Sequence, residues 1–248
     1  MSEPSMSLPA DVDSMAYISH ELTTPITTIR WNAELLRMGK MTTPLDAEQA
    51  KVVDEILLGV SIMSNLVNDI HESSWLERDK FADAPVPTVL AEVVSTAQEQ
   101  QAAAIGTKKL TVKLDVDTSL PPIVARPSTL LLIAQNLISN AVKYTLPEGS
   151  VTVSLRFASD EEAAKSRAGG GCVVLCVADT GIGIPAEQQD QVFNKFFRAD
   201  NARSLNIEGT GFGLYIVDLA VQKLDGVVWF ESAEQKGSSF YVLLPLKN

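Results

Sequence analysis

The sequence predicts two folded parts: a helical hairpin that pairs with a second copy of itself into a four-helix bundle, and then an α/β sandwich. The chain has 248 residues, 46% of them apolar, which is enough for two buried cores. Residues 11–78 carry apolar side chains at helical spacing, whereas residues 88–248 alternate strand-like and helical segments. Between them, residues 79–87 are charged and then Pro-rich, as in a linker, and residues 1–10 are predicted to be disordered.

Two amphipathic helices are predicted in the first part, over residues 11–39 and 45–77. Their apolar residues recur at spacings of three and four, and Gly39 ends the first helix. A hairpin of two helices cannot cover both apolar stripes by itself, so pairing with a second copy is the economical solution. The sequence therefore predicts a homodimer.

The second part is predicted to be one mixed sheet covered on one face by helices. Apolar runs separated by turn residues define its elements. Residues 158–171, rich in small and charged residues, are expected to form a solvated insertion between two strands. The predicted helices span residues 88–105, 127–144 and 213–224, and the predicted strands span residues 110–116, 152–157, 172–179, 227–232 and 238–245.

Composition and charge argue against several partners and compartments. A net charge of −11 and the lack of a Lys/Arg block argue against nucleic acid. Cys172 and Cys176 lie in one strand-like run, about 13 Å apart if extended, so no disulfide can join them and a reducing compartment is expected. The sequence shows no signal peptide or membrane-spanning run. We expect a cytoplasmic location, either of a soluble protein or of the cytoplasmic portion of a longer, membrane-anchored one.

His20 is the first candidate for chemistry. It lies one helical turn before Thr24, on the same face of the first predicted helix. Pro25 removes the N–H that would bond the Glu21 carbonyl, so a bend just past His20 is expected. A surface histidine on a bundle helix is the alternative interpretation, which His20 and Glu21 alone would favour. The proline adds weight to the functional interpretation.

A polar stripe on the predicted helix 127–144 is the second candidate site. Asn136, Asn140 and Lys143 fall on one line of an otherwise apolar helix. Buried polar groups without partners cost about 1–3 kcal/mol each, so a polar ligand is favoured over the alternative, a polar seam on an exposed face. Amide oxygens suit Mg²⁺, and the Lys143 ammonium suits a phosphate oxygen.

Two glycine-rich turns complete the set. Asp179 begins DTGIGIP at the end of a strand, where its carboxylate can accept a hydrogen bond from an exocyclic amine. The turn GTGFGL, residues 209–214, opens onto a helix whose N-terminus favours phosphate. The aromatic and basic segment 193–203 between them is expected to be a mobile lid. A plain turn and an ordinary aromatic core segment are the alternatives.

In their order and spacing these motifs resemble those of the sensor histidine kinases of two-component systems. SHELTTPI resembles the H box, QNLISNAVKYT the N box, DTGIGIP the first glycine box, FNKFFRAD the F box, GTGFGL the second glycine box and KGSSFYVLLP the closing strand motif. The resemblance implies a dimerisation and histidine phosphotransfer domain over residues 11–78 and a catalytic domain of the Bergerat (GHKL) ATP-binding fold over residues 88–248. It also implies ATP and Mg²⁺ as cofactors and the receiver domain of a response regulator as partner.

The resemblance also implies roles for individual residues. His20 would accept the γ-phosphoryl of ATP and pass it to an aspartate of the regulator, Glu21 would orient or deprotonate the imidazole, and Thr24 would position water when the regulator is dephosphorylated. Asn140 would hold Mg²⁺, and Asp179 would read adenine. The residues expected to bind ATP are Asn136, Asn140, Lys143, Tyr144, Asp179, Gly181, Gly183, Ile184, Phe196, Arg198, Gly209, Thr210, Gly211, Phe212, Gly213, Leu214 and Ser239.

Asn136 separates this chain from other proteins that share the same ATP-binding fold. Gyrase-like, chaperone and mismatch-repair ATPases carry a glutamate there as the base that activates water, and an amide cannot take that proton. The resemblance further implies that Tyr144 flanks the base and that Ser239 supports the adenine end. Thr23 stands where a basic residue is usual, and Arg126 where an aspartate is frequent. A non-catalytic ATP-binding scaffold and an ATP-driven conformational machine are the competing functional hypotheses.

Overall fold

The computed structural model describes residues 14–40, 44–78, 83–166, 171–205, 207 and 209–246, and only the backbone of residues 14–21, 77 and 78. The expected disordered N-terminus, the first half of the expected linker and residues 167–170 of the expected insertion therefore lie outside the described residues. The chain divides into two compact units, Met1–Trp75 and Leu76–Asn248.

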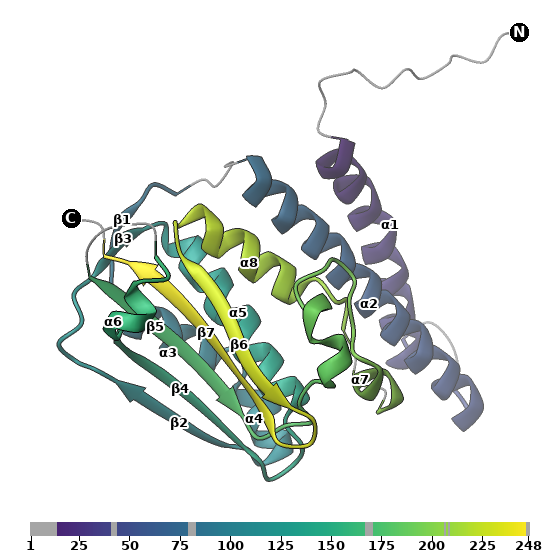
Figure 1. Cartoon of the computed structure of the whole chain (residues 1–248). Helices are drawn as coiled ribbons and strands as arrows, with labels where there is room; N and C mark the ends of the chain where they lie inside the picture. The colour runs from purple at the N-terminus through teal and green to yellow at the C-terminus, as the bar shows by residue number, and fades with distance from the viewer. Residues whose placement is uncertain are drawn as a thin grey trace, which may run out of the picture. The chain divides into compact units, whose positions relative to one another are not determined.

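The first unit is the predicted helical hairpin (Figure 1). Helix α1 spans Ser14–Arg37 and continues through Pro25, and helix α2 spans Ala47–Arg78. A capping box fixes the start of α2. The Asp46 Oδ1 atom accepts a hydrogen bond from the Gln49 N–H at 2.8 Å, and Gln49 Oε1 accepts one from the Asp46 N–H at 3.2 Å.

The two helices meet through a small buried cluster of Ile26, Val60 and Val67. Two polar contacts add to it: Arg30 donates to Ser64 Oγ at 2.9 Å, and the Arg37 guanidinium lies 2.7 Å from the Asp54 carboxylate. Many other large apolar side chains of the hairpin remain exposed. They include Leu22, Ile29, Trp31, Val52, Ile56, Leu58, Ile62 and Met63.

The second unit is built on a five-stranded sheet with the strand order β2-β4-β5-β7-β6. Strands β2 and β4 are parallel, and the other neighbouring pairs are antiparallel. The strands are β2 (Thr111–Val116), β4 (Ser150–Phe157), β5 (Cys172–Asp179), β6 (Val227–Ala233) and β7 (Gly237–Pro245).

Three helices cover one face of this sheet, which confirms the predicted sandwich (Figure 1). They are α3 (Leu90–Glu99), α5 (Pro127–Tyr144) and α8 (Gly213–Lys223). Helix α5 lies in the middle, between α3 and α8. Its apolar side is buried, as are alternate residues of β4, so the polar stripe on α5 must face elsewhere.

The single helix predicted over residues 88–105 is wrong. Val86–Thr88 forms strand β1, which pairs with strand β3 (Ile123–Ala125), and the remainder is divided into α3 and helix α4 (Ala102–Lys108). The break at Gln100 and Gln101 has no local signal, because Gln and Ala are both good helix formers. Strand β1 depends on pairing with a distant segment, which helical spacing cannot predict.

The end of the expected linker is also part of the fold. Asp83 accepts hydrogen bonds from the Ser128 N–H at 3.0 Å and from the Ser128 hydroxyl at 2.6 Å, and so caps the N-terminus of α5. Arg126 Nε donates to the Asp83 carbonyl at 3.0 Å. The residue before this helix lacks a capping side chain, and Asp83 supplies one from another part of the chain.

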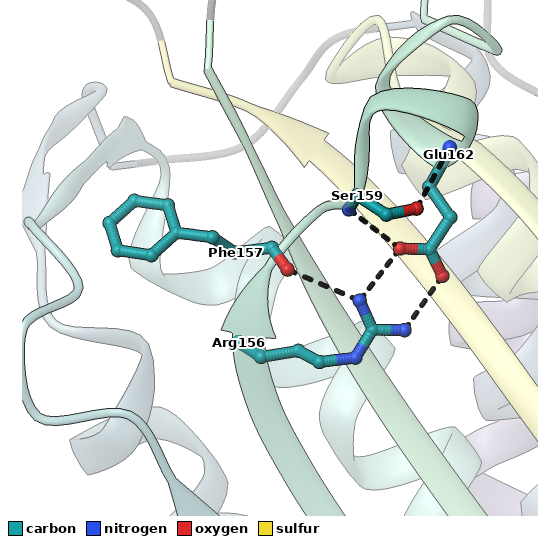
Figure 2. A network of polar contacts seen from close by, with 4 residues as sticks. All are labelled: Arg156, Phe157, Ser159 and Glu162. Carbon is teal, nitrogen blue, oxygen red and sulfur yellow. Dashed lines mark hydrogen bonds and ion pairs between the residues drawn. The ribbon is translucent and has the colours of Figure 1, made fainter.

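The described part of the insertion between β4 and β5 is structured rather than merely solvated. Helix α6 (Asp160–Ala163) begins with a capping box between Ser159 and Glu162. The Arg156 guanidinium donates two hydrogen bonds, of 2.6 and 2.7 Å, to the Glu162 carboxylate (Figure 2). These bonds lower the pKa of Glu162 to about 2. The Lys165 ammonium lies 4.1 Å from the centre of the Trp229 ring, on the sheet face that α5 and α8 leave open.

Cys172 and Cys176 both lie in strand β5, as predicted; Cys172 is buried, Cys176 is half-buried, and no disulfide joins them. Within the part of the chain that the structure describes, no helix is both long enough and apolar enough to cross a membrane.

Candidate functional site

Helix α5 presents the predicted stripe of Asn136, Asn140 and Lys143, all half-buried. The Asn136 Nδ2 group donates to the Leu132 carbonyl at 2.9 Å, which fixes the orientation of the amide. The Lys143 ammonium lies 4.8 Å from the centre of the Tyr144 ring. Two amides and an ammonium are therefore held along one edge of a buried helix.

The second glycine box packs directly on this stripe. A Cβ atom on Gly213 would lie 2.8 Å from Asn136 Oδ1 and 3.5 Å from Asn140 Nδ2, and one on Gly209 would collide with Lys143 Nζ. Gly213 therefore allows α8 to approach the two amides closely, and Gly209 lies against the flexible end of Lys143. Because Gly213 is the first residue of α8, the positive end of that helix lies beside the two amides.

Asp179 lies at the end of β5, as predicted. Its Oδ1 atom accepts hydrogen bonds from the Gly181 N–H at 2.8 Å and the Ser238 N–H at 3.3 Å. Burial raises the pKa of the Asp179 carboxyl to about 6, although these two hydrogen bonds oppose the rise. Desolvation of a charged carboxylate lowers the stability of the fold, and such groups are common at functional sites.

The first glycine box is wedged between α5 and the β6–β7 hairpin. A Cβ on Gly181 would collide with the Tyr144 carbonyl, and one on Gly183, whose φ is +62°, would collide with the Ala233 carbonyl. The Ile184 N–H donates to Ser232 Oγ at 2.9 Å. These contacts leave no room for side chains and hold the loop against the end of α5.

The segment between the glycine boxes brings aromatic and basic groups to the same region. Phe196 is exposed, has a φ of +65° and contacts the buried Phe212 edge-to-face at 4.5 Å. Gly211, with a φ of +80°, packs against the backbone of Phe196 and Phe197. Thr210 Oγ1 accepts a hydrogen bond from the Phe212 N–H at 3.3 Å.

Arg198 joins this segment to the Tyr144 side of the site. It donates to the Ile207 carbonyl, and its charge counteracts the burial that raises the pKa of the Tyr144 phenol. The Arg198 Nε atom is buried with no hydrogen-bond partner in the described part of the chain. A buried cationic donor of this kind suits an acceptor atom on a bound ligand.

Two amide side chains, those of Gln188 and Asn201, fix the ends of this segment and were not predicted from the sequence. Gln188, in the 3₁₀ helix η1 (Ala186–Gln191), exchanges hydrogen bonds of 2.5 and 3.0 Å with the side chain and N–H of Asp200. Asn201, in helix α7 (Asp200–Ser204), donates to the Gly183 carbonyl at 3.0 Å. No motif marks these residues. Polar side chains next to a glycine box would have been the only signal.

Ser239, predicted to support the adenine end, does not contact Asp179; its neighbour Ser238 does. Ser238 pairs with Asp179 across the β5–β7 ladder and donates its N–H to that carboxylate, whereas Ser239 pairs with Ala178. Successive residues of a strand point to opposite faces, so the Ser239 side chain cannot support the Asp179 end. Its hydroxyl instead interacts with Tyr241.

His20 and Glu21 lie in α1, but their side chains are outside the described part of the structure. Thr24 is exposed one turn later, and its carbonyl accepts a hydrogen bond from Thr28 Oγ1 at 3.0 Å. The remaining predicted residue, Leu214, is half-buried in the first turn of α8.

Among the described residues, no group of three or more His, Cys, Asp or Glu side chains is arranged to hold a metal ion. A metal at this site would therefore depend on the α5 amides and on oxygens from a ligand. Such a donor set suits Mg²⁺, which prefers oxygen and commonly binds together with phosphates.

Comparison with known proteins identifies families for both units. Residues 125–248 match the model of the histidine kinase-, DNA gyrase B- and HSP90-like ATPases. Residues 12–79 match the His Kinase A (phospho-acceptor) domain. The chain is 34% identical over 236 residues to the circadian input-output histidine kinase CikA of Synechococcus elongatus, covering 93% of this chain and 29% of that protein.

Other similar proteins are also histidine kinases. The sensor histidine kinase WalK of Bacillus subtilis is 30% identical over 248 residues, with 94% of this chain and 36% of WalK covered. Full-length ShkA, solved in complex with AMPPNP, superimposes with a TM-score of 0.71 at 25% identity, over 95% of this chain and 46% of that one. This chain thus spans less than half the length of these relatives. The two family models follow one another in the order of the two structural units, and the chain therefore belongs to the sensor histidine kinases of two-component systems.

Proposed function

We propose that the second unit binds ATP with Mg²⁺ and that the first unit accepts the γ-phosphoryl group on His20. The observation that carries the proposal is the packing of Gly209 and Gly213 on Lys143, Asn136 and Asn140. It joins two motifs that are distant in the sequence. The result is a single site with an ammonium, two amides and the N-terminus of α8, a combination that suits a polyphosphate.

The opposite end of the site suits adenine. Asp179 Oδ1 accepts hydrogen bonds from two backbone N–H groups. The other carboxylate oxygen can accept a hydrogen bond from an exocyclic amine. Tyr144 connects the two ends of the site, because its backbone carbonyl packs against Gly181 beside Asp179 and its ring centre lies 4.8 Å from Lys143 Nζ. We infer that the base lies near Asp179 and Tyr144 and that the phosphates extend toward α8.

Mg²⁺ would neutralise charge on the phosphates during transfer. Asn140 is the residue that would hold it, with Asn136 assisting, and Lys143 would bind a phosphate oxygen. The Asn136 amide cannot take a proton from water, so this site lacks the hydrolytic base that its position could otherwise provide. The phosphoryl group is thereby reserved for a bound nucleophile.

His20 is the nucleophile that we propose. Its neutral imidazole would attack the γ-phosphorus in line, with Glu21 orienting the ring or taking its proton. Thr24, exposed one turn later on the same face, would position water for dephosphorylation of the partner. The partner would be the receiver domain of a response regulator, which takes the phosphoryl group on an aspartate.

A homodimer completes the proposal, because the exposed apolar side chains of the hairpin need a cover. A second copy pairing into a four-helix bundle supplies it.

The proposal is tested by incubating the chain with [γ-³²P]ATP and Mg²⁺. We expect an acid-labile, alkali-stable label that is absent from His20→Gln and Asn140→Ala. Nucleotide binding without any label would instead support a non-catalytic scaffold, and sustained hydrolysis without label would support an ATP-driven machine.

A further inference from the structure

Lys108 makes an unusual set of contacts outside the predicted site. It is the last residue of α4, and its ammonium donates to the carbonyls of Val142, Lys143 and Thr145 at 2.9, 2.6 and 2.9 Å. An ammonium has three N–H donors, and all three are used. Burial lowers the pKa of Lys108, as expected for a charge drawn out of water.

These carbonyls belong to the C-terminal end of α5. The last carbonyls of a helix have no partner within the helix, and the negative end of the helix dipole lies there. The remaining carbonyl of this group, that of Tyr144, accepts a hydrogen bond from the Ile182 N–H of the first glycine box at 3.2 Å. The end of the N-box helix is therefore held by Lys108 on one side and by a glycine box on the other.

Packing alone does not explain why α4 is held here, because α4 has no buried side chain. Lys108 supplies three side-chain hydrogen bonds that join this short helix to α5. Its three bonds converge on one turn, so they fix the direction of that turn as well as its position.

The same turn carries Lys143 and Tyr144, and both residues lie close to glycines of the two glycine boxes. A Cβ on Gly209 would collide with Lys143 Nζ, and a Cβ on Gly181 would collide with the Tyr144 carbonyl. A shift of the turn would therefore move the Tyr144 carbonyl against Gly181 of the first glycine box. It would also move the ammonium proposed to meet the phosphates.

We propose that Lys108 is a positioning residue of the nucleotide site. It fixes the last turn of α5 so that Lys143 reaches a phosphate oxygen, and it does not touch nucleotide itself. This inference rests on the proposed function. The competing possibility is that Lys108 only stabilises the fold, as any cation at a helix C-terminus can.

A double-mutant cycle separates these possibilities. The Kd of AMPPNP with Mg²⁺ is measured by calorimetry on the full chain for Lys108→Met, Lys143→Met and the double variant. We expect Lys108→Met to raise Kd roughly tenfold, about the effect of losing one charged hydrogen bond. In the Lys143→Met background the same substitution should change Kd less than about twofold, because the contact it positions is already lost.

Two further variants guard against a trivial outcome. Lys109→Met removes a neighbouring positive charge whose side chain is exposed, and should leave Kd unchanged. Lys108→Gln keeps two N–H donors without the charge, and should give an intermediate Kd. Urea unfolding of each variant shows whether the protein is folded under the conditions of the titration.

Equal losses of affinity in both backgrounds, or no loss on Lys108→Met in folded protein, would overturn the positioning role and leave the proposed function intact. Failure of the unmodified chain to bind AMPPNP would overturn both.

Discussion

Replacing Asp179 with asparagine should stabilise the second unit while weakening nucleotide binding. Asp179 is half-buried at the end of β5, and its only two described hydrogen bonds come from backbone N–H groups to one oxygen. Asparagine has nearly the same shape and keeps an oxygen for both N–H groups. The substitution therefore removes a buried charge without removing its local contacts.

The size of the effect follows from the pKa of Asp179. Its rise from 3.8 to about 6 means that ionising this carboxyl in the folded chain costs about 3 kcal/mol more than in the unfolded chain. The new amide N–H₂ recovers less than that if it lacks an acceptor. We expect Asp179→Asn to raise the free energy of unfolding at pH 7 by about 1–3 kcal/mol.

The stability difference between the parent and the asparagine variant should depend on pH. Because the folded pKa is raised, the contribution of Asp179 to stability is fully present below its ordinary pKa of 3.8 and is lost as pH rises through about 6. The advantage of the asparagine variant should therefore be complete above pH 6 and vanish near pH 4.

Urea unfolding measures this in a background that isolates the second unit. Trp229 is the only tryptophan after residue 75, so Trp31→Phe and Trp75→Phe leave its fluorescence as the reporter. The variant should also bind AMPPNP about 10- to 100-fold more weakly, since an amide N–H₂ would face the exocyclic amine of adenine. A variant less stable than its parent at pH 7, or equally advantaged at pH 4 and pH 7, would refute the reasoning.

Three further outcomes are expected. Gly213→Ala should slow autophosphorylation at least about tenfold, because its Cβ would lie 2.8 Å from the Asn136 amide oxygen on α5. Gly59→Ala, whose Cβ would have no atom within 4 Å, should not slow it, and initial labelling rates of the two variants measure the difference. Asn201→Ala frees the Gly183 carbonyl and should raise KM for ATP severalfold with little change in kcat. A fall in kcat as large as the rise in KM would contradict a role in holding the first glycine box. Glu162→Gln should lower the free energy of unfolding at pH 7 by only about 0.5–1 kcal/mol, because its partner Arg156 is partly exposed. This cost should fade as the pH drops from 4.5 toward 2, and a cost that stays constant with pH in urea titrations would contradict the ion pair.

The long amphipathic elements could be predicted from the sequence, and so could the stripe on α5. Helix α5 matches its predicted bounds because proline begins it and apolar periodicity continues throughout. Strand β5 is equally well predicted, since a continuous apolar run bounded by glycines suits a buried strand. In both cases the signal lies within the segment itself.

The elements that could not be predicted depend on partners distant in the sequence. Strand β1 exists because β3 pairs with it, and Asp83 caps a helix that begins more than 40 residues later. The choice between Ser238 and Ser239 depends on the register of β7 against β5. A shift of one residue reverses which face a side chain occupies, and composition does not contain that information.

Lys108 and Asn201 were missed for a related reason. Each binds backbone carbonyls, and carbonyl groups have no sequence signature. Residue types predict which side chains can meet a ligand, but the side chains that hold the backbone in place become visible only in three dimensions.

Mapping the phosphorylated residue tests the central claim most directly. The chain has two histidines, and trypsin separates them, because the first basic residue is Arg30 and His71 lies between Lys51 and Arg78. After incubation with ATP and Mg²⁺ and an alkaline quench, mass spectrometry should find one phosphoryl group on His20, in the peptide of residues 1–30, and none on His71. A phosphoryl group on any other residue, or phosphate release with no phosphorylated peptide, would contradict the account.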